Sequence, residues 1–498
     1  MSGPGTVSGN RGLDIAEPLI FEQGKAGRSG VDLADPPAVE SRLGGLARDG
    51  EIGLPGLSEP QVVRHYTRLS RNNYGIDTGF YPLGSCTMKH NPRMNERLAR
   101  LPGFADLHPL QPDSTIQGAL QVIDTLALWL KTLTGMPAIA MAPAAGAQGE
   151  LCGIMAIRAC LEARGDARKV VLVPDSAHGT NPATAAACGY DIDTVPDGGD
   201  GRIDRAALEA RLGDDVAAIM LTNPNTCGLF ERDIVEIAAA AHEAGALFYC
   251  DGANLNAIMG RVRPGDLGVD AMHFNLHKTF STPHGGGGPG AGPVALSAEL
   301  APFAPLPWVV SGPDGLRLAE AGEDVPQALG RLRAFHGQFG VFVRALAYMM
   351  SHGGSGLRQV SEDAVLNANY ILAGLADLLP PVFPGPCMHE ALFDDSALSD
   401  SGVTTLDIAK ALIDEGCHPM TIYFPLVVHG AMLIEPTETE SRETLDGFIA
   451  TMRALIAKAK DGDTAFFEAA PRHAPRRRLD EAQAARQPVL RWQKRDGS

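Results

Sequence analysis

Polar side chains follow four short apolar runs in the middle of the chain, at the point where each run ends. The runs cover residues 169–173, 216–221, 246–250 and 270–274. The groups that follow them, in chain order, are His178, then Asn223 and Thr226, then Asp251, then His277 and Lys278. In open α/β sheets, ligands bind beyond the carboxyl ends of the strands. We therefore expect imidazole, amide, hydroxyl, carboxylate and amine groups to meet at one edge of a sheet.

Catalysis by pyridoxal phosphate needs this set of groups. A lysine amine such as that of Lys278 forms a Schiff base with the cofactor aldehyde, and an acid such as Asp251 keeps the pyridine nitrogen protonated. A flat imidazole such as that of His178 stacks on the ring. The phosphate needs a glycine-rich turn before a helix, and residues 146–149 precede a helix that we expect to begin near Glu150. The sequence therefore predicts pyridoxal 5'-phosphate bound covalently to Lys278.

Each of these residues also has an ordinary structural explanation. A single histidine or aspartate after a strand is commonly a cap or a turn former, and Lys278 could be a surface lysine before the glycine run 285–288. That run lacks the G-K-[ST] of a nucleotide-binding loop. It fits a tight backbone crossing or loop as well as it fits a close approach of backbone to the cofactor. Four such segments in order favour the site.

Charge excludes two classes of partner. The chain of 498 residues has a net charge of −17 and a pI near 5.3. Binding to nucleic acid or to anionic membranes needs basic surface, which such a protein lacks. We interpret the short basic cluster at residues 476–478 as a solvated or interface patch.

The cysteines and the start of the chain indicate a reducing compartment. The eight cysteines form no C-x-x-C pair, and no cysteine–histidine spacing indicates zinc, so no metal site is expected. Cys387 with His389 and Cys417 with His418 could act as ligands or thiol–base pairs, which we consider the weaker hypothesis. Neither a signal peptide nor an apolar run of membrane-spanning length is evident, so we expect a cytoplasmic protein.

Helical patterns separate and follow the apolar runs. Residues 60–73 predict a first helix, and residues 114–135 predict an amphipathic helix capped by Ser114 and ended by Gly135. Residues 234–245 predict a helix with Gly245 as its C-cap. Further helices are expected over 342–354, 362–379 and 404–416.

Short apolar strands that alternate with helices predict an α/β fold with a mostly parallel sheet covered on both faces. We expect an N-terminal arm and helix over residues 1–80, a large cofactor-binding domain over 81–340, and a smaller C-terminal α+β domain with an extended tail over 341–498.

Longer motifs point to a known family. The stretches "YPLGSCTMK" and "NLHKTFSTPHGGGGPG" are highly specific, and they are accompanied by "GAQGELCGIMAI", "DSAHGTNPATAA", "LTNPNTCGLFE" and "YCDGANLNAIMG". The chain resembles the β subunits of two-subunit glycine decarboxylase, the P-protein of the glycine cleavage system. The resemblance runs from about residue 18 to residue 493. Residues 1–17 and Cys227 depart from the family pattern.

The resemblance implies the aspartate-aminotransferase type of fold, known as fold type I of the pyridoxal-phosphate-dependent transferases. It implies Lys278 as the Schiff-base lysine, Asp251 as the partner of the pyridinium and His178 as the stacking residue. It also maps further positions onto cofactor contacts, namely Ala147 and Gln148 to the phosphate turn, Thr226 or Asn223 to the ring hydroxyl, and His277 near the phosphate. "YPLGSCTMK" is expected near the site, with no step assigned to Ser85, Cys86 or Lys89.

The activity that the resemblance implies is decarboxylation of glycine, followed by transfer of the aminomethyl group to the lipoyl group of the H-protein. It also implies a partner α subunit in an α2β2 assembly. Two alternatives stay open from the residues. One is another pyridoxal enzyme, a decarboxylase or lyase acting alone. The other is a scaffold subunit without activity, which the joint presence of Lys278, Asp251 and His178 disfavours.

Overall fold

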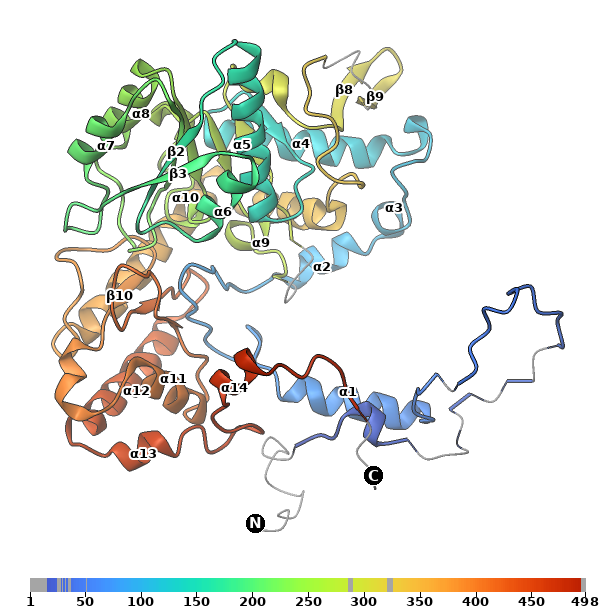
Figure 1. Ribbon diagram of the computed structural model, residues 1–498, viewed down its shortest axis with the longest axis vertical. Coiled ribbons are helices and arrows are strands. Elements are labelled where there is room, and N and C mark those ends of the chain that lie inside the picture. Colours follow the sequence, from blue (N-terminus) through green and yellow to red (C-terminus); the bar gives the residue numbers. More distant parts are fainter. Residues whose placement is uncertain are drawn as a thin grey trace.

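A seven-stranded sheet lies at the centre of the larger body of the molecule in the computed structural model (Figure 1). The structure describes residues 16–493 except 25–27, 29, 32, 35–36, 51, 285–289 and 320–325. The strands are β1 (Ala138–Ala140), β2 (Val170–Pro174), β3 (Asp191–Val195), β4 (Val216–Thr222), β5 (Leu247–Asp251), β6 (Ala271–His273) and β7 (Val294–Leu296). Their order is β1-β7-β6-β5-β4-β2-β3. Strand β7 points in the opposite direction to the other six strands of this sheet.

The four predicted strands are confirmed as β2, β4, β5 and β6, each within about one residue of its predicted bounds. They are parallel to one another, and β4 is buried at every position, as a strand covered on both faces must be. The antiparallel strand β7 was not predicted, because it follows the glycine run and has only three residues.

The helices differ widely in length. They are α1 (Glu59–Arg71), α2 (Arg93–Ala99), α3 (Pro102–Ala105), α4 (Gln117–Thr134), α5 (Gly146–Ala163), α6 (Thr180–Ala187), α7 (Arg205–Arg211), α8 (Ile234–Glu243), α9 (Leu276–Thr279), α10 (Phe339–Leu375), α11 (Thr405–Asp414), α12 (Arg442–Lys460), α13 (Thr464–Glu468) and α14 (Glu481–Arg486). None of those among the described residues combines the length and apolar character of a membrane span.

Alternate residues of the strands face two different hydrophobic clusters. On one face, Leu172, Phe248 and Met272 pack with α4, α8 and the first half of α10. On the other face, Tyr249 and Ala271 pack with α5. Successive side chains of a strand point to opposite faces, so helices on both sides bury the whole sheet.

Helix boundaries differ from the prediction at three places. α4 begins at Gln117 after a 3-10 turn over Asp113–Thr115, so Ser114 does not cap it. Gly135 ends α4 in the left-handed region, as predicted. α8 has Ala244 as its C-cap, and Gly245 is the next residue, at a φ of 76°. α5 begins at Gly146, one turn before the predicted Glu150.

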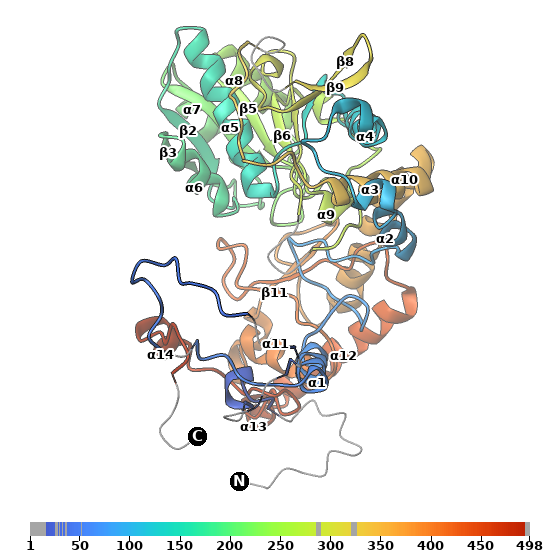
Figure 2. The same ribbon diagram turned by 90° about the vertical axis from the view of Figure 1, so that its right-hand side faces the viewer.

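The C-terminal part forms a second body below the sheet (Figure 2). Its antiparallel sheet consists of β10 (Ala391–Phe393), β12 (Met432–Ile434) and β11 (Thr421–Ile422), in that order. The strands share a hydrophobic cluster with α11, α12 and the end of α10. The two helices predicted over 342–354 and 362–379 form the single element α10, with non-helical backbone at Gly353. The first half of α10 packs in a hydrophobic cluster of the large sheet, and its end packs in the cluster of the C-terminal body. Helix α10 therefore joins the two bodies.

An N-terminal arm extends away from both bodies and includes α1 (Figures 1 and 2). The C-terminal tail runs beside it, where Phe21 stacks on Trp492 with ring centroids 5.3 Å apart. Glu17 accepts hydrogen bonds from the guanidinium of Arg68, at 2.6 and 2.7 Å. A small two-stranded sheet, β8 (Trp308–Gly312) with β9 (Gly315–Ala319), lies at the opposite end of the molecule.

Candidate active site

A cavity of about 410 Å³ opens at the carboxyl ends of β4, β5 and β6, where the two bodies meet. The start of α5 and the loop before α6 form part of its wall, and Thr421 and Phe424 contribute from the C-terminal body. Of the predicted site residues, the wall contains Lys278, Asp251, His178, Ala147, Thr226 and His277. The strand ends therefore bring together most of the groups that the sequence pointed to.

Asp251 ends β5 and is buried at the floor of the cavity. The Asn181 amide donates to one carboxylate oxygen at 3.0 Å, and the Ala253 N–H donates to the other at 2.9 Å. Burial by itself raises the pKa of an acid. The contact with His273, the two hydrogen bonds and the charge of Lys278 outweigh it and hold the pKa of Asp251 below its usual value. Asp251 thus stays ionised and can hold a positively charged group.

Glu150, in the second turn of α5, is a second buried carboxyl group near Asp251. It accepts hydrogen bonds from Thr180 Oγ1 at 2.8 Å and from Asn181 Nδ2 at 3.0 Å. Burial and the charge of Asp251 raise the pKa of Glu150. The site therefore divides its acids into one that stays ionised and one that tends to keep a proton. Sequence reasoning named Glu150 only as the start of a helix.

His273, the last residue of β6, also escaped the sequence analysis. Its Nε2 lies 3.4 Å from Asp251 Oδ1, and the Tyr249 hydroxyl lies 2.5 Å from its Nδ1. The ligand atoms of Glu150, Asp251 and His273 lie within 4.8 Å of one another, a spacing that could hold a metal ion. Both oxygens of Asp251 already accept hydrogen bonds from N–H groups, which fits a hydrogen-bonded carboxylate better than a cation ligand.

Lys278 lies in α9, the short helix that follows β6. Its amine donates a hydrogen bond to the backbone carbonyl of Ser85, at 2.9 Å. Ser85 belongs to the motif "YPLGSCTMK", so the structure places that motif in the cavity wall opposite the sheet. No pattern within either motif could have shown this contact, because the two residues are far apart in the chain.

Two imidazoles and a thiol lie close to Lys278. His277 Nδ1 accepts the backbone N–H of Ala291 at 3.2 Å, and His284 Nε2 lies 3.3 Å from Cys86 Sγ. Burial lowers the pKa of His277 to about 3 and that of His284 to about 4, helped in both cases by the charge of Lys278. Burial raises the pKa of the Cys86 thiol. All three groups are therefore neutral near pH 7.

His178 stands at the open side of the cavity, in the loop between β2 and α6. Its Nδ1 lies 2.8 Å from Thr180 Oγ1, and its ring meets Phe424 edge-on at 5.8 Å. The side chain is exposed on its free face. A flat ring held in this way can cover a planar group bound above Asp251.

The start of α5 supplies the turn predicted for a phosphate. Gly146 and Ala147 line the cavity, and Ala145 at the N-cap makes no side-chain cap hydrogen bond. The first N–H groups of such a helix attract an anion. A Cβ on Gly146 would approach Asn275 Nδ2 to 2.7 Å, so only glycine leaves this turn open. The Gln148 side chain instead accepts the backbone N–H of Ala144, at 2.7 Å, and does not line the cavity.

The segment after β4 presents different residues from those expected. Thr226 lines the cavity but donates its hydroxyl to the Ser176 carbonyl at 2.5 Å. Asn223 accepts the backbone N–H of Glu231 at 3.1 Å and is not part of the cavity wall. Thr222, which the sequence analysis overlooked, lines the cavity with a buried hydroxyl that has no hydrogen-bond partner among the described residues.

The groups present fit pyridoxal phosphate. The cavity combines an amine, an ionised carboxylate, a flat imidazole and a helix start without a side-chain cap. Buried polar atoms normally find partners, and two from residues of the cavity wall, Thr222 Oγ1 and Asn275 Oδ1, have none among the described residues. A polar, planar ligand with an anionic arm would satisfy the donors and the orphaned atoms together.

Residues 83–89 cross between the two bodies and form one side of the cavity. Every second residue of this segment from Ser85 on binds a buried or nearly buried carboxyl group of the C-terminal body, through its side chain or its backbone N–H. These pairs are the Ser85 N–H with Glu390 at 2.8 Å, the Thr87 hydroxyl with Glu435 at 2.5 Å, and the Lys89 amine with Glu438 at 2.6 Å. Cys86, between Ser85 and Thr87, faces His284 and the cavity.

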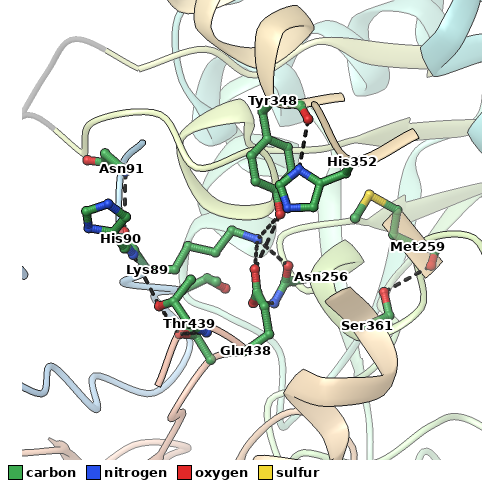
Figure 3. Close-up of polar contacts among 12 residues, drawn as sticks. Lys89, His90, Asn91, Asn256, Met259, Tyr348, His352, Ser361, Glu438 and Thr439 are labelled. Atoms are coloured by element: carbon green, nitrogen blue, oxygen red, sulfur yellow. Dashed lines mark hydrogen bonds and ion pairs between the residues drawn. The ribbon is translucent and has the colours of Figure 1, made fainter. Parts of the chain in front are cut away.

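Lys89 is the most deeply anchored residue of the segment (Figure 3). Besides Glu438, its amine donates to Asn256 Oδ1 at 2.8 Å and to the Tyr348 hydroxyl at 3.2 Å. Tyr348 comes from α10 and Asn256 from the turn after β5, so the single amine joins three parts of the molecule (Figure 3). Lys89 is therefore bound to a structural network, not exposed in the cavity.

Behind Ser85, three buried side chains from the C-terminal body lie together. The ligand atoms of His389, Glu390 and Glu435 are within 4.8 Å of one another. Burial and the mutual repulsion of the acids raise the pKa of Glu390 well above its usual value, and burial raises the pKa of Glu435 to about 7. Burial lowers the pKa of His389 to about 3. Of these residues the sequence analysis named only His389.

The two cysteine–histidine pairs considered from the sequence lie outside the cavity wall. The backbone of Cys387 exchanges hydrogen bonds with the Asn369 side chain. His418 stacks on Tyr81, with ring centroids 3.7 Å apart. The glycine run 285–288, the third feature left open, lies outside the described residues.

Known proteins resemble this chain along nearly its whole length. A family profile described as glycine dehydrogenase, C-terminal domain, matches residues 360–476, and one described as aminotransferase class-V matches residues 149–290. "Probable glycine dehydrogenase (decarboxylating) subunit 2" of Caulobacter vibrioides is 68% identical over 498 residues, covering 99% of this chain and 95% of that protein. The protein of the same description from Desulforamulus reducens is 52% identical, covering 96% of this chain and 99% of that protein.

Solved structures show the same fold. The glycine decarboxylase (P-protein) of the glycine cleavage system, crystallised in an inhibitor-bound form, superposes with a TM-score of 0.69 and 23% identity, covering 83% of this chain and 93% of that one. A mutant of C-DES, with glycine covalently linked to the PLP cofactor, gives a TM-score of 0.58 at 16% identity, covering 75% of this chain and 96% of that one. The predicted fold type I of pyridoxal-phosphate-dependent transferases is confirmed.

Proposed function

The chain belongs to the family of glycine dehydrogenase (decarboxylating) subunit 2, and from this premise we propose that it decarboxylates glycine and transfers the remaining aminomethyl group to the lipoyl group of the H-protein. The observation that carries the proposal is one cavity shared by the Asp251 carboxylate, at the end of β5, and the Lys278 amine, from α9 after β6. A scaffold that had lost activity would not need an ionised acid buried beneath an amine.

Pyridoxal phosphate supplies an aromatic ring that accepts the electron pair left when glycine loses its carboxylate. Asp251, ionised at the cavity floor, would hold a proton at the ring nitrogen. His178 would cover the ring, and the N–H groups at Gly146 and Ala147 would bind the phosphate. Thr222 and Thr226 offer hydroxyl groups to the ring substituents, so Thr226 is the better placed of the two residues first considered for that contact.

Lys278 has two tasks in this scheme. Its amine would hold the cofactor covalently and would give way to the amino group of glycine. Once free, it stays in the cavity and can move a proton to or from the reacting carbon. The neighbouring imidazoles of His277 and His284 are neutral, so neither adds positive charge beside the Lys278 amine. The enclosed site also disfavours charge on that carboxylate, which assists its loss.

The transfer step needs no oxidant or reductant other than the lipoyl disulfide itself. The aminomethyl carbon forms a bond to one sulfur of the lipoyl disulfide, the S–S bond breaks, and the second sulfur takes a proton and leaves as a thiol. The disulfide is thus reduced while carbon dioxide departs. The lipoyl arm would enter by the open side of the cavity, past His178 and Phe424.

The N-terminal arm has features of a surface that binds a partner subunit. We propose that this partner is subunit 1, in an α2β2 assembly. Leu33, Val39 and Leu46 on the arm are more than four-fifths exposed, as are Val489 and Leu490 on the tail beside it. Exposed apolar side chains gathered on one extension mark a protein interface. All eight cysteines are free thiols, which fits the reducing cytoplasm that we propose as its location.

Borohydride reduction followed by peptide mass spectrometry tests the covalent link directly. We expect the reduced cofactor on the peptide that contains Lys278, and no visible absorbance of bound cofactor in Lys278→Ala. Lys169 is exposed and precedes β2 at the opposite edge of the same sheet, so Lys169→Ala is the matched control and should label like the wild type.

Exchange of labelled bicarbonate into glycine tests the reaction. It should require the partner subunit and lipoylated H-protein. Exchange that proceeds equally with H-protein lacking the lipoyl group would point to a decarboxylase acting alone. A wild-type complex that binds no cofactor at Lys278 would contradict the proposal.

A further inference from the structure

The backbone N–H and the backbone carbonyl of Ser85 are each held by a side chain, and the two side chains come from different bodies. Its N–H donates to Glu390 Oε2 at 2.8 Å, and its carbonyl accepts the Lys278 amine at 2.9 Å. Ser85 has a φ of 59°, in the left-handed region that a residue with a side chain rarely adopts. Such a conformation persists only where the surroundings impose it, and it occurs preferentially at functional sites.

The Ser85 side chain is not what imposes this conformation. Its hydroxyl is buried and has no hydrogen-bond partner among the described residues. The residue's polar contacts are those of its backbone, of which the bond to Glu390 fixes the direction of the N–H. The two peptide units that meet at the Ser85 Cα are related only by φ and ψ, so fixing the N–H at this φ limits the directions that the carbonyl can take.

We propose that the Ser85 carbonyl is the docking site of the Lys278 amine whenever that amine is not covalently engaged, and that Glu390 is the positioning residue that holds the carbonyl there. The inference deepens the proposed function and rests on it for its catalytic meaning. A lysine that is released and re-engaged in each cycle needs a defined place to wait, because a flexible side chain would otherwise sample many rotamers.

The neighbouring carboxyl groups explain why Glu390 suits this task. It is fully buried, and burial and Glu435 raise its pKa well above the usual value, so at a given pH it carries less negative charge than an ordinary glutamate. A charged Glu390 would compete with Asp251 and draw the Lys278 ammonium away from the cavity. A neutral acceptor orients the peptide and leaves the amine at the carbonyl.

The test uses the cofactor-free full-length protein, in which Lys278 is a free amine. A brief pulse of acetic anhydride acetylates exposed and mobile amines, and mass spectrometry gives the labelling rate of Lys278 relative to exposed Lys169. Loss of one hydrogen bond corresponds to about a five-fold change in the population of the held amine. We expect Lys278 to label about five-fold faster in Glu390→Leu and in Glu390→Asp, whose shorter side chain no longer reaches Ser85.

Two variants distinguish positioning from loss of structure. Glu390→Gln keeps an acceptor oxygen in a neutral isostere and should label like the wild type. Ser361→Ala removes a different buried hydrogen bond, from the Ser361 hydroxyl to the Met259 carbonyl at 3.0 Å (Figure 3). It should lower the melting temperature without changing the Lys278 rate. If Glu390→Leu does not fold, Glu390→Asp carries the comparison.

An unchanged Lys278 rate in a folded Glu390→Leu or Glu390→Asp protein would overturn the inference. An equal increase in Ser361→Ala would overturn it too, because general loosening would then explain the effect. The labelling needs neither cofactor nor glycine, so its result is independent of whether the proposed reaction is right. That reaction is judged separately, by the cofactor link and the bicarbonate exchange.

Discussion

Two buried carboxyl groups share the floor of the cavity, and their surroundings shift their pKa values in opposite directions. Asp251 accepts two N–H hydrogen bonds and lies near His273, which keeps it ionised, whereas burial beside Asp251 raises the pKa of Glu150. At the scale of the residue, this difference decides which acid can serve the cofactor. Only an ionised acid holds a proton on a ring nitrogen.

Asp251→Asn should therefore abolish most of the activity while leaving the fold intact. The amide has the same shape but no charge, so we expect bicarbonate exchange to fall by at least about 100-fold. Visible absorbance of the cofactor bound at Lys278 should persist. Glu150→Gln replaces a group that already tends to keep a proton and should cost much less activity. Equal losses in the two variants would contradict the assignment of charges.

Buried imidazoles make the stability of the fold depend on pH. Burial lowers the pKa of His277 and His389 to about 3 and that of His284 to about 4, against 6.5 for an ordinary histidine. Below pH 6.5 the unfolded chain binds protons that the folded chain does not. The stability is thus fully present above that pH and is lost as the pH falls toward 4, by up to about 1.4 kcal/mol per pH unit for each histidine.

Urea unfolding of the cofactor-free protein at about pH 7.5 and about pH 5 checks this prediction. Glu435, with a pKa raised to about 7, acts in the opposite direction between those values, so the comparison must be between variants. His284→Asn should lose less stability on acidification than the wild type. His90→Asn, at an exposed histidine, should follow the wild type. If His284→Asn also followed the wild type, the imidazole of His284 would not be neutral in the folded state.

At the scale of elements, the segment 83–89 acts as a connector that is anchored by the C-terminal body and forms a wall of the site. Lys89 at its end is nearly fully buried in an ion pair with Glu438. Removing one partner of a buried pair leaves an uncompensated charge, whereas replacing both by apolar groups can restore stability.

Lys89→Met should lower the free energy of unfolding by about 3 kcal/mol, because it strands the carboxylate of Glu438. The double variant Lys89→Met/Glu438→Leu should recover a substantial part of this loss. Urea unfolding of the four proteins in the cycle, including Glu438→Leu alone, measures the coupling. Additive losses would show that the two side chains do not depend on each other.

At the scale of the whole molecule, the arm and tail lie apart from both bodies and expose apolar side chains that neither body covers. Leu33→Asp/Leu46→Asp should therefore weaken assembly with the partner subunit by at least about ten-fold, because charge at the core of an interface is strongly unfavourable. Analytical ultracentrifugation of the mixed subunits measures this weakening of assembly.

The control for the arm is Val235→Asp, which places the same charge at an exposed apolar residue of α8, on the sheet body. It should assemble like the wild type, and both variants should still bind the cofactor at Lys278. Normal assembly of the arm variant would show that the partner binds elsewhere.

Much of the fold followed from the sequence because its signals are local. Uniformly apolar runs gave the four parallel strands, and Gly135 marked the end of α4, since only a residue without Cβ easily adopts the left-handed conformation there. The start of α4 was misplaced because a 3-10 turn precedes it, so Ser114 lies outside the first turn. The break in α10 lies at Gly353, where the backbone is non-helical, and was predicted only as a gap between two helices.

The sequence by itself determined which chemistry is present: an amine, an acid and an imidazole at the ends of consecutive strands, where parallel pairing must bring them together. Only the tertiary structure decided the charges and the neighbours. The pairing of Asp251 with Glu150 and His273, and the contacts of Ser85 with Glu390 and Lys278, join residues distant in the chain. Burial and long-range contacts set a pKa or direct a carbonyl, and neither is encoded in the spacing of a motif.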